Sequence, residues 1–243
     1  MCSGSKRSLD RYDMSLRSDS MSDRDRRRGQ EMRRADRDAV KAEARRRGIR
    51  ALYHFTAVGN LPSIAEKGLL SRARLADDPA VLINDADRFD GFLDYIALSV
   101  SQPNTRLLYT FATANRERGY AIIEIYRSVL WTRGNLFTWT NAAAGPCLRV
   151  PRKELQGSRA FSRLFADRCR TANGSVERTS DHLPKHPTDS QAEVLVPESI
   201  GTRRIRCVHF YNLKRLVKFL TAHPQFDLPV CLSPGLFEAD HGH

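Results

Sequence analysis

The stretch LYHFTAVGNLPSIAEKGLL, residues 52–70, predicts a strand that turns directly into a short helix. Its first part continues the segment IRALYHFT, residues 49–56, whose apolar and aromatic content is typical of a buried strand. His54 and Thr56 are polar residues near the end of this strand. A buried polar side chain must be paired or used in a site, so both are candidate functional residues.

The helix that follows is short and has clear ends. Asn60 directly precedes Leu61, Pro62 and Ser63, which predicts an N-cap with proline in the first helical turn. Apolar residues then recur at helical spacing, and Gly68 is expected to end the helix.

The rest of the chain mixes strands and helices without strict alternation. LDYIALSVSQPN, residues 93–104, has a period of two that places Ile96, Leu98 and Val100 on one face. Further strands are expected in GYAIIEIYRSVLW (119–131), QAEVLVP (191–197) and RIRCVHFYNL (204–213), and helices in RAFSRLFADRCR (159–170) and NLKRLVKFLTAH (212–223). This order favours an α+β fold with a mixed sheet.

The 243 residues allow one core of ordinary size with an appendage. We expect a basic N-terminal arm over residues 1–47, a folded domain over 48–222 and a C-terminal tail over 223–243. No apolar run approaches the roughly 20 residues needed to cross a bilayer, and the N-terminus lacks the apolar core of a secretory signal. The expected location is therefore the cytoplasm.

The net charge of +12 favours a polyanionic partner such as nucleic acid. Residues 1–50 hold 16 Lys or Arg against nine Asp or Glu, so the excess is steepest in the arm. Residues 1 to about 30 are poor in apolar residues and are expected to be disordered. Residues 31–47 predict a helix with mixed charges, either a solvated face or a phosphate-contacting arm.

The five cysteines are odd in number and widely spaced, which predicts free thiols rather than a disulfide framework. Cys169, His182 and His186 form a weak metal-ligand pattern, but a second cysteine at short spacing is missing. We expect polar loop histidines and no metal site.

Three polar residues suggest a chemistry when they are taken together: His54, Arg88 and Glu193. Glu193 begins an apolar strand, where a carboxylate must be paired or used. A carboxylate can stabilise the oxocarbenium-like state formed when a sugar loses a nicotinamide leaving group. Histidine and arginine supply the donors and the cation that bind ribose hydroxyls and phosphates.

Three successive blocks of the sequence resemble the DarT family of NAD-dependent ADP-ribosyltransferase toxins that modify bases in DNA. The blocks are LYHFTAVGNLPSIAEKGLLS, DADRFDGFLDYIALSVSQPNTRLLY and QAEVLVPESI, and the resemblance runs from about residue 48 to residue 213. It implies an ADP-ribosyltransferase fold, a split mixed β-sheet core with flanking helices that binds NAD in its cleft.

The resemblance also implies roles for individual residues. Arg88 and Glu193 would be catalytic, with Arg88 at the end of a loop over NAD that runs from about Leu75 to Asp90. The residues implied to bind NAD are His54, Phe55, Thr56, Ser63, Ser71 and Arg88. Residues from about 147 to 192 would form the loop that recognises the substrate, with Arg163, Arg168, Arg170, Arg178 and Lys185 as its basic groups.

The implied reaction transfers ADP-ribose from NAD to a base, in single-stranded DNA because base edges are accessible there without flipping. A macrodomain antitoxin that removes the mark is the implied partner. The segment IALSVSQPNTRLLY departs from the aromatic VPFYF-like strand of the thymidine-modifying branch, so the acceptor base stays open. Two alternatives also remain: a transferase directed at RNA or protein, and a non-catalytic nucleic-acid-binding protein.

Overall fold

The computed structural model describes residues 23–75, 81–82, 90–115 and 117–238. Seven of the described strands form one mixed sheet in the order β11-β10-β4-β1-β3-β8-β5. Neighbouring strands are antiparallel except β10 and β11, which are parallel. Their bounds are β1 Ala51–Ala57, β3 Tyr95–Val100, β4 Tyr120–Tyr126, β5 Leu136–Thr138, β8 Glu193–Pro197, β10 Ile205–Phe210 and β11 Val230–Leu232. The predicted α+β fold with a mixed sheet is confirmed.

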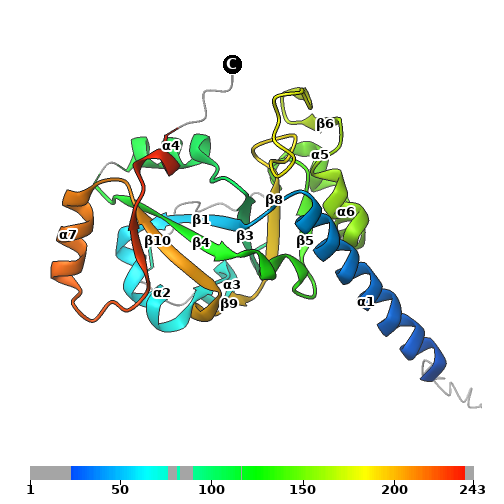
Figure 1. Ribbon diagram of the computed structural model, residues 1–243, viewed down its shortest axis with the longest axis horizontal. Helices are drawn as coiled ribbons and strands as arrows, with labels where there is room; N and C mark the ends of the chain where they lie inside the picture. The colour runs from blue at the N-terminus through cyan, green and yellow to red at the C-terminus, as the bar shows by residue number, and fades with distance from the viewer. Residues whose placement is uncertain (1–22, 76–80, 83–89, 116, 239–243) are drawn as a thin grey trace, which may run out of the picture.

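Helices pack on both faces of the sheet: α1, α2, α6 and α7 on one, and α4 and α5 on the other. Figure 1 shows α1 and α7 at opposite ends of the molecule. The main core joins the inward residues of the central strands to side chains from four of these helices. The α-helices are α1 Asp23–Arg46, α2 Leu61–Lys67, α3 Arg72–Leu75, α4 Thr105–Ala114, α5 Gly145–Leu148, α6 Gly157–Arg163 and α7 Leu213–Ala222. The described part of the chain holds no helix long and apolar enough to cross a membrane.

The remaining elements are short. The described residues also form two small sheets, β2 Leu69–Leu70 with β9 Ser199–Ile200, and the hairpin of β6 Arg168–Thr171 with β7 Gly174–Glu177. The 3₁₀ helices are η1 Val58–Asn60, η2 Arg127–Trp131, η3 Arg152–Leu155, η4 Thr202–Arg204 and η5 Pro234–Leu236.

The period of two predicted for β3 is confirmed. Ile96, Leu98 and Val100 lie in the main core, whereas Tyr95 and Ala97 face a second apolar cluster on the other side of the sheet. Alternate side chains of a strand point to opposite faces of the sheet, so a period of two in the sequence predicts which residues face the core.

The charged arm helix is longer than predicted and packs on the domain. Residues 23–30, expected to be disordered, form the first turns of α1, consistent with the high helix propensity of arginine. Val40 and Ala44 are buried in the main core. A carboxylate oxygen of Asp36 accepts hydrogen bonds from the Ser158 backbone N–H, at 2.8 Å, and hydroxyl, at 2.6 Å. The arm therefore caps the N-terminus of α6. Residues 1–22 lie outside the described residues.

Three expectations need correction. The helix predicted over residues 159–170 ends at Arg163, and Cys169 lies in β6 instead. Part of the polar segment 171–190 pairs as β7, because Gly174 at φ 124° allows a tight turn after Thr171. The segment expected to be a C-terminal tail supplies β11 to the sheet. The division of the chain at residues 47 and 222 into domains stays a prediction.

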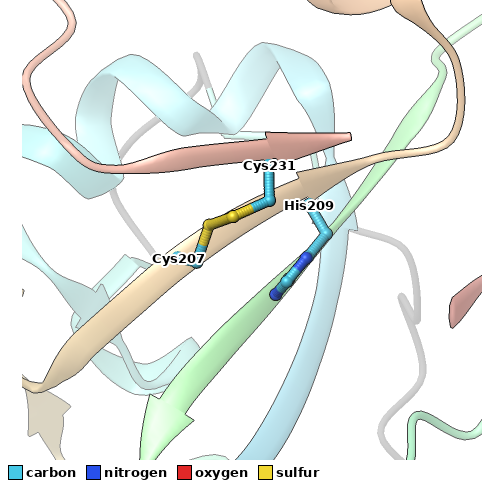
Figure 2. A group of neighbouring side chains, drawn as sticks. All are labelled: Cys207, His209 and Cys231. Carbon is cyan, nitrogen blue, oxygen red and sulfur yellow. A yellow bond between two sulfur atoms is a disulfide. The ribbon is translucent and has the colours of Figure 1, made fainter. Parts of the chain in front are cut away.

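The prediction of free thiols is wrong for two cysteines. Cys207 on β10 and Cys231 on β11 form a disulfide, with their Cα atoms 6.5 Å apart, and Figure 2 shows it beside His209. The two cysteines are 24 residues apart in sequence and come together only because the two strands are parallel neighbours. Cys147 and Cys169 are free and buried, and Cys2 lies outside the described residues.

Candidate active site

The sheet splits between β1, its middle strand, and the neighbouring β3. These strands pair only at Leu52 with Val100 and at Tyr53 with Ser99. Beyond this point β1 pairs with β4 as far as Ala57, while β3 pairs with β8. The two halves of the sheet therefore diverge and leave room between them.

His54 bridges the split at its closed end. Its Nδ1 lies 3.0 Å from the backbone oxygen of Ala97 on β3. Because a carbonyl oxygen only accepts, the Nδ1 atom must carry the proton and donate it. This contact fixes the orientation of the imidazole ring.

The space between the two halves is a cavity of about 240 Å³. Its wall contains residues from both halves of the sheet and from α2, α3, α4 and the turn after β5. The cavity brings together five of the residues singled out in the sequence: His54, Phe55, Thr56, Ser63 and Glu193. Apolar side chains such as Leu69 and Phe111 make up much of the remaining wall. A mainly apolar cavity with a few convergent polar groups is typical of a site for a small molecule.

Phe55 and Thr56 lie on opposite faces of β1. Phe55 packs against Phe111 of α4, with ring centroids 6.0 Å apart, and forms an apolar part of the wall. The Thr56 side chain is buried, and its hydroxyl oxygen accepts a hydrogen bond of 3.0 Å from Nδ2 of Asn60.

Asn60 has a role that the sequence did not indicate. Its side chain makes no capping hydrogen bond to α2. Its Nδ2 donates to the backbone oxygen of Leu82 at 2.9 Å, and its Oδ1 accepts from the backbone N–H of Leu82 at 2.8 Å. Both Asn60 and Leu82 line the cavity. Asn60 therefore ties Leu82 to β1. It is the N-cap residue of α2 with proline in the first turn, as predicted, but its side chain does not cap the helix.

Glu193 is the first residue of β8 and faces the cavity from the second half of the sheet. It pairs in register with Ser99 on β3 and Thr138 on β5. Its Oε2 accepts a hydrogen bond of 2.8 Å from the backbone N–H of Ala142. The carboxylate is thus held by a rigid strand and a backbone donor at the edge of the same cavity as His54.

A sequence model of the family described as "ssDNA thymidine ADP-ribosyltransferase, DarT" matches residues 53–235. The match covers most of the chain, including both walls of the cavity.

The chain belongs to the DarT family.

Solved structures of DarT proteins have a similar fold. The structure of Thermosipho africanus DarTG in complex with ADP-ribose matches with a TM-score of 0.54 and 20% identity over 77% of this chain. The chain spans 51% of that longer protein. Thermus sp. 2.9 DarT in complex with ADP-ribosylated ssDNA matches with a TM-score of 0.49 and 16% identity, covering 77% of this chain and 96% of the other. No curated protein matches the chain.

Two of the residues that the DarT resemblance implies are not in the cavity wall as described. Ser71 lies next to the wall, and Arg88 lies outside the described residues. Ser71 is buried directly beside the lining residues Leu70 and Arg72. Its hydroxyl has no hydrogen-bond partner among the described residues, and its backbone N–H donates to the Glu198 oxygen at 2.8 Å. Arg88 lies among residues 83–89, outside the described part of the chain.

The basic residues of the segment 147–192 differ in their surroundings. The Arg178 guanidinium donates to the backbone oxygens of Leu183 at 2.7 Å and His186 at 2.9 Å, so it stabilises the loop from inside. The Arg163 guanidinium lies 3.8 Å from the centre of the Trp139 ring. Lys185 lines a second cavity.

Among the described residues, one group has side chains close enough to hold a metal ion: Cys207, His209 and Cys231. Figure 2 shows that the two sulfur atoms of this group form the disulfide. Among the described residues, the side chains of Cys169, His182 and His186 do not lie close enough together to form such a group. Burial also raises the pKa of the Cys169 thiol to about 11, which disfavours the thiolate that a metal needs.

Proposed function

We propose that this protein transfers ADP-ribose from NAD to a base of single-stranded DNA and releases nicotinamide. The observation that carries the proposal is the placement of Glu193 and His54 on opposite sides of one cavity, in a chain that belongs to the DarT family. The carboxylate and the imidazole come from different halves of the split sheet, and each is oriented by a backbone contact.

The chemistry of the wall fits NAD. Apolar surface suits the nicotinamide ring, and hydroxyl and imidazole groups suit the ribose hydroxyls. We assign NAD binding to His54, Phe55, Thr56, Ser63, Ser71 and Arg88, with Arg88 also orienting the acceptor base. Thr56 and Ser63 contribute hydroxyl groups, and Phe55 contributes an aromatic wall.

NAD supplies a glycosidic bond between the anomeric carbon of a ribose and a cationic nicotinamide. When this bond breaks, nicotinamide leaves with the bonding electron pair, and positive charge develops on the ribose. We assign stabilisation of that charge to Glu193. The nucleophilic atom of the base then bonds to the anomeric carbon, and the base loses a proton to restore its neutrality.

The family description makes thymidine the first acceptor base to test, although β3 departs from the thymidine-modifying pattern. The proposed location is the cytoplasm, and the proposed partner is an antitoxin of the macrodomain type that removes the modification. A test of the partner is direct: a macrodomain protein should release ADP-ribose from DNA that this protein has modified.

The central experiment measures product masses. The protein is incubated with NAD and single-stranded DNA, duplex DNA or RNA, and each oligonucleotide is analysed by mass spectrometry. We expect single-stranded DNA to gain the mass of one ADP-ribose and fragment masses to identify the base. Glu193→Gln should lower the rate at least about 100-fold, since it removes the charge that stabilises the transition state.

Glu154→Gln is the matched control, because Glu154 is an exposed carboxylate in η3 and lines neither cavity. This variant should keep the wild-type rate. A mass gain on RNA alone would replace DNA by RNA as the substrate. No mass gain on any oligonucleotide, together with salt-sensitive binding that survives Glu193→Gln, would favour a non-catalytic nucleic-acid-binding protein.

A further inference from the structure

A second cavity, of about 570 Å³, lies where the arm meets the domain. Its wall is formed by the end of α1, the start of β1, the end of β3 and the loop that precedes Glu193. We call it the arm groove. Tyr53 lines both the arm groove and the active-site cavity, so the two are neighbours on opposite sides of one residue.

The arm groove is strongly basic. It is lined by Arg47, Arg50, Lys185 and Arg206, and Glu124 is the acidic residue in its wall. Nη1 of Arg206 lies 3.0 Å from Oε1 of Glu124, so this acidic charge is already paired. The groove therefore carries an uncompensated positive charge, which attracts a polyanion.

Two of the four cations are available for a ligand. Arg50 is exposed and Lys185 is half-buried, and neither forms an ion pair with another described residue. Arg47, in contrast, is engaged in the structure. Its Nε lies 2.6 Å from Oε1 of Glu43, and its guanidinium lies 3.9 Å from the centre of the Phe165 ring.

The groove also contains a hydroxyl donor without a partner. Ser101 follows β3 with φ 65°, and its Oγ is buried with no hydrogen-bond partner among the described residues. A buried hydroxyl without a partner is costly unless a ligand or water satisfies it.

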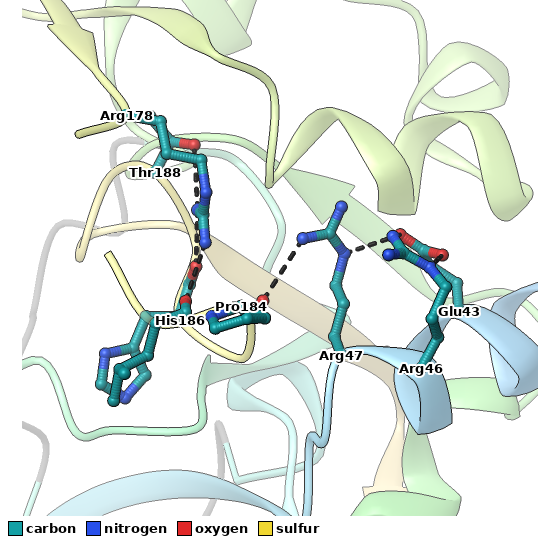
Figure 3. A network of polar contacts seen from close by, with 8 residues as sticks. Glu43, Arg46, Arg47, Arg178, Pro184, His186 and Thr188 are labelled. Carbon is teal, nitrogen blue, oxygen red and sulfur yellow. Dashed lines mark hydrogen bonds and ion pairs between the residues drawn. The ribbon is translucent and has the colours of Figure 1, made fainter. Parts of the chain in front are cut away.

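The two sides of the groove are joined by a network of polar contacts, shown in Figure 3. Nη1 of Arg47 donates to the backbone oxygen of Pro184 at 3.3 Å, which connects the arm to the loop. Arg178 in turn donates to the backbone oxygen of His186 at 2.9 Å, and Thr188 donates to the Ala166 oxygen at 2.6 Å. The groove is thus pre-organised, and Lys185, the last loop residue in its wall, precedes Glu193 by eight residues.

These observations favour an extended anion over a single ion. The groove holds two available cations from different segments, a hydroxyl donor and the aromatic ring of Tyr53, and it adjoins the active-site cavity. Binding sites for single-stranded nucleic acid combine such basic grooves with aromatic side chains.

We propose that the arm groove binds the phosphate backbone of the single-stranded DNA whose base enters the active-site cavity, with Arg50 and Lys185 as the phosphate contacts. The proposal rests on the proposed function and adds to the substrate-binding surface a groove beside the arm, in which Arg50 lies outside the DarT family match. Its role is electrostatic and independent of the base sequence.

The test measures the affinity of the full-length protein for a labelled single-stranded oligonucleotide, without NAD, from about 50 to about 200 mM salt. The logarithm of the affinity falls as the logarithm of the salt concentration rises, and each lost phosphate contact makes this dependence less steep by about 0.7 for single strands. We expect Arg50→Ala with Lys185→Ala to reduce the steepness by about 1.4 and to weaken the affinity roughly tenfold. In the transfer reaction the KM for DNA should rise by a similar factor, while the KM for NAD stays unchanged.

Arg203→Ala with Lys214→Ala is the matched control. Both residues are exposed, on η4 and α7, and neither lines a cavity, so this pair removes the same charge elsewhere. Arg50→Lys with Lys185→Arg should keep the wild-type slope, because it preserves both charges. Thermal unfolding of each variant should match that of the wild type, since neither side chain forms an ion pair with another described residue.

A slope change no larger than that of the control pair would overturn the proposal, as would a change seen with RNA but not with DNA. Failure of the proposed function is a separate result. In that case the wild type would add no mass to any DNA, whatever the variants do to binding.

Discussion

At the scale of single residues, Asn60 contributes three hydrogen bonds to the wall of the active-site cavity. It is buried, and its amide satisfies both backbone groups of Leu82 and the hydroxyl of Thr56. A buried amide with this many partners holds two separate segments in fixed positions.

Asn60→Ala should therefore remove both hydrogen bonds that hold the backbone of Leu82. We expect a loss of about 1 to 3 kcal/mol in the free energy of unfolding, because the partly buried backbone N–H and oxygen of Leu82 lose their partners. The KM for NAD should rise more than kcat falls, since the substitution loosens a wall and leaves Glu193 in place. Steady-state kinetics and urea unfolding measure both effects. Asn173→Ala, at an exposed turn, is the control, and an unchanged KM for NAD in Asn60→Ala would contradict the assignment.

His209 is a second buried polar residue, outside the cavity. Its Nε2 lies 3.1 Å from Oε2 of Glu124, and its Nδ1 lies 2.9 Å from Oγ of Ser233. Burial lowers the pKa of His209 below its ordinary value of 6.5, and this effect exceeds the opposing influence of Glu124. The folded protein therefore favours the neutral ring.

This shift predicts a pH dependence of stability. The unfolded chain takes up the proton at about pH 6.5 and the folded protein only at lower pH, so the contribution of His209 is complete above about pH 6.5 and is lost as the pH falls below it. Urea unfolding at several pH values should show a steeper decline for the wild type than for His209→Asn. His182→Asn, which leaves His209 intact, should follow the wild type. Parallel curves for the wild type and His209→Asn would exclude this role of His209.

The candidate residues illustrate what the sequence could predict. A carboxylate at the start of an apolar strand is conspicuous, and Glu193 lies in the cavity as such a position suggests. Asn60 occupies the predicted N-cap position, but its side chain binds the backbone of Leu82 instead of the helix. The sequence could not indicate this contact, because Leu82 is 22 residues away. The roles of Arg88 and of the other candidates in catalysis stay predictions.

At the scale of elements, β11 is the least protected strand of the main sheet. It has three residues, lies at the edge of the sheet and pairs only with β10. The Cys207–Cys231 disulfide links these two strands across a sequence separation of 24 residues. The sequence could not predict this pairing, because it depends on a parallel contact between segments that α7 separates.

Cys207→Ser with Cys231→Ser should lower the free energy of unfolding by about 3 kcal/mol, the loop-closure entropy for a loop of this length. A reducing agent should destabilise the wild type by a similar amount and leave the double variant unchanged. Urea unfolding with and without dithiothreitol measures this difference. Equal stability of the oxidised and reduced wild type would contradict it. Disulfides are rare in a reducing cytoplasm, so the bond also makes the proposed cytoplasmic location a point to test.

At the scale of the whole molecule, two half-sheets meet along a short seam. The apolar content of β1 and the period of two in β3 predicted both strands. The split between them depends on where their pairing stops, which no local pattern encodes. The long polar segment before Glu193 was predicted as a loop. Part of it is the second strand of a hairpin. The turn around Leu183 and Pro184 is held by hydrogen bonds from Arg178 and from Arg47, which follows the distant α1.

The cap that Asp36 provides to α6 has a consequence for engineering. A Cβ at Gly157 would collide with the Asp36 carboxylate, so the two segments fit each other as a matched pair. Grafting this arm onto another member of the family would therefore need Gly157 and Ser158 to be transplanted with it. Conversely, an expression fragment that begins at residue 53, where the family match begins, would lack both Asp36 and the first two residues of β1. The arm and the residues that follow it are best expressed together.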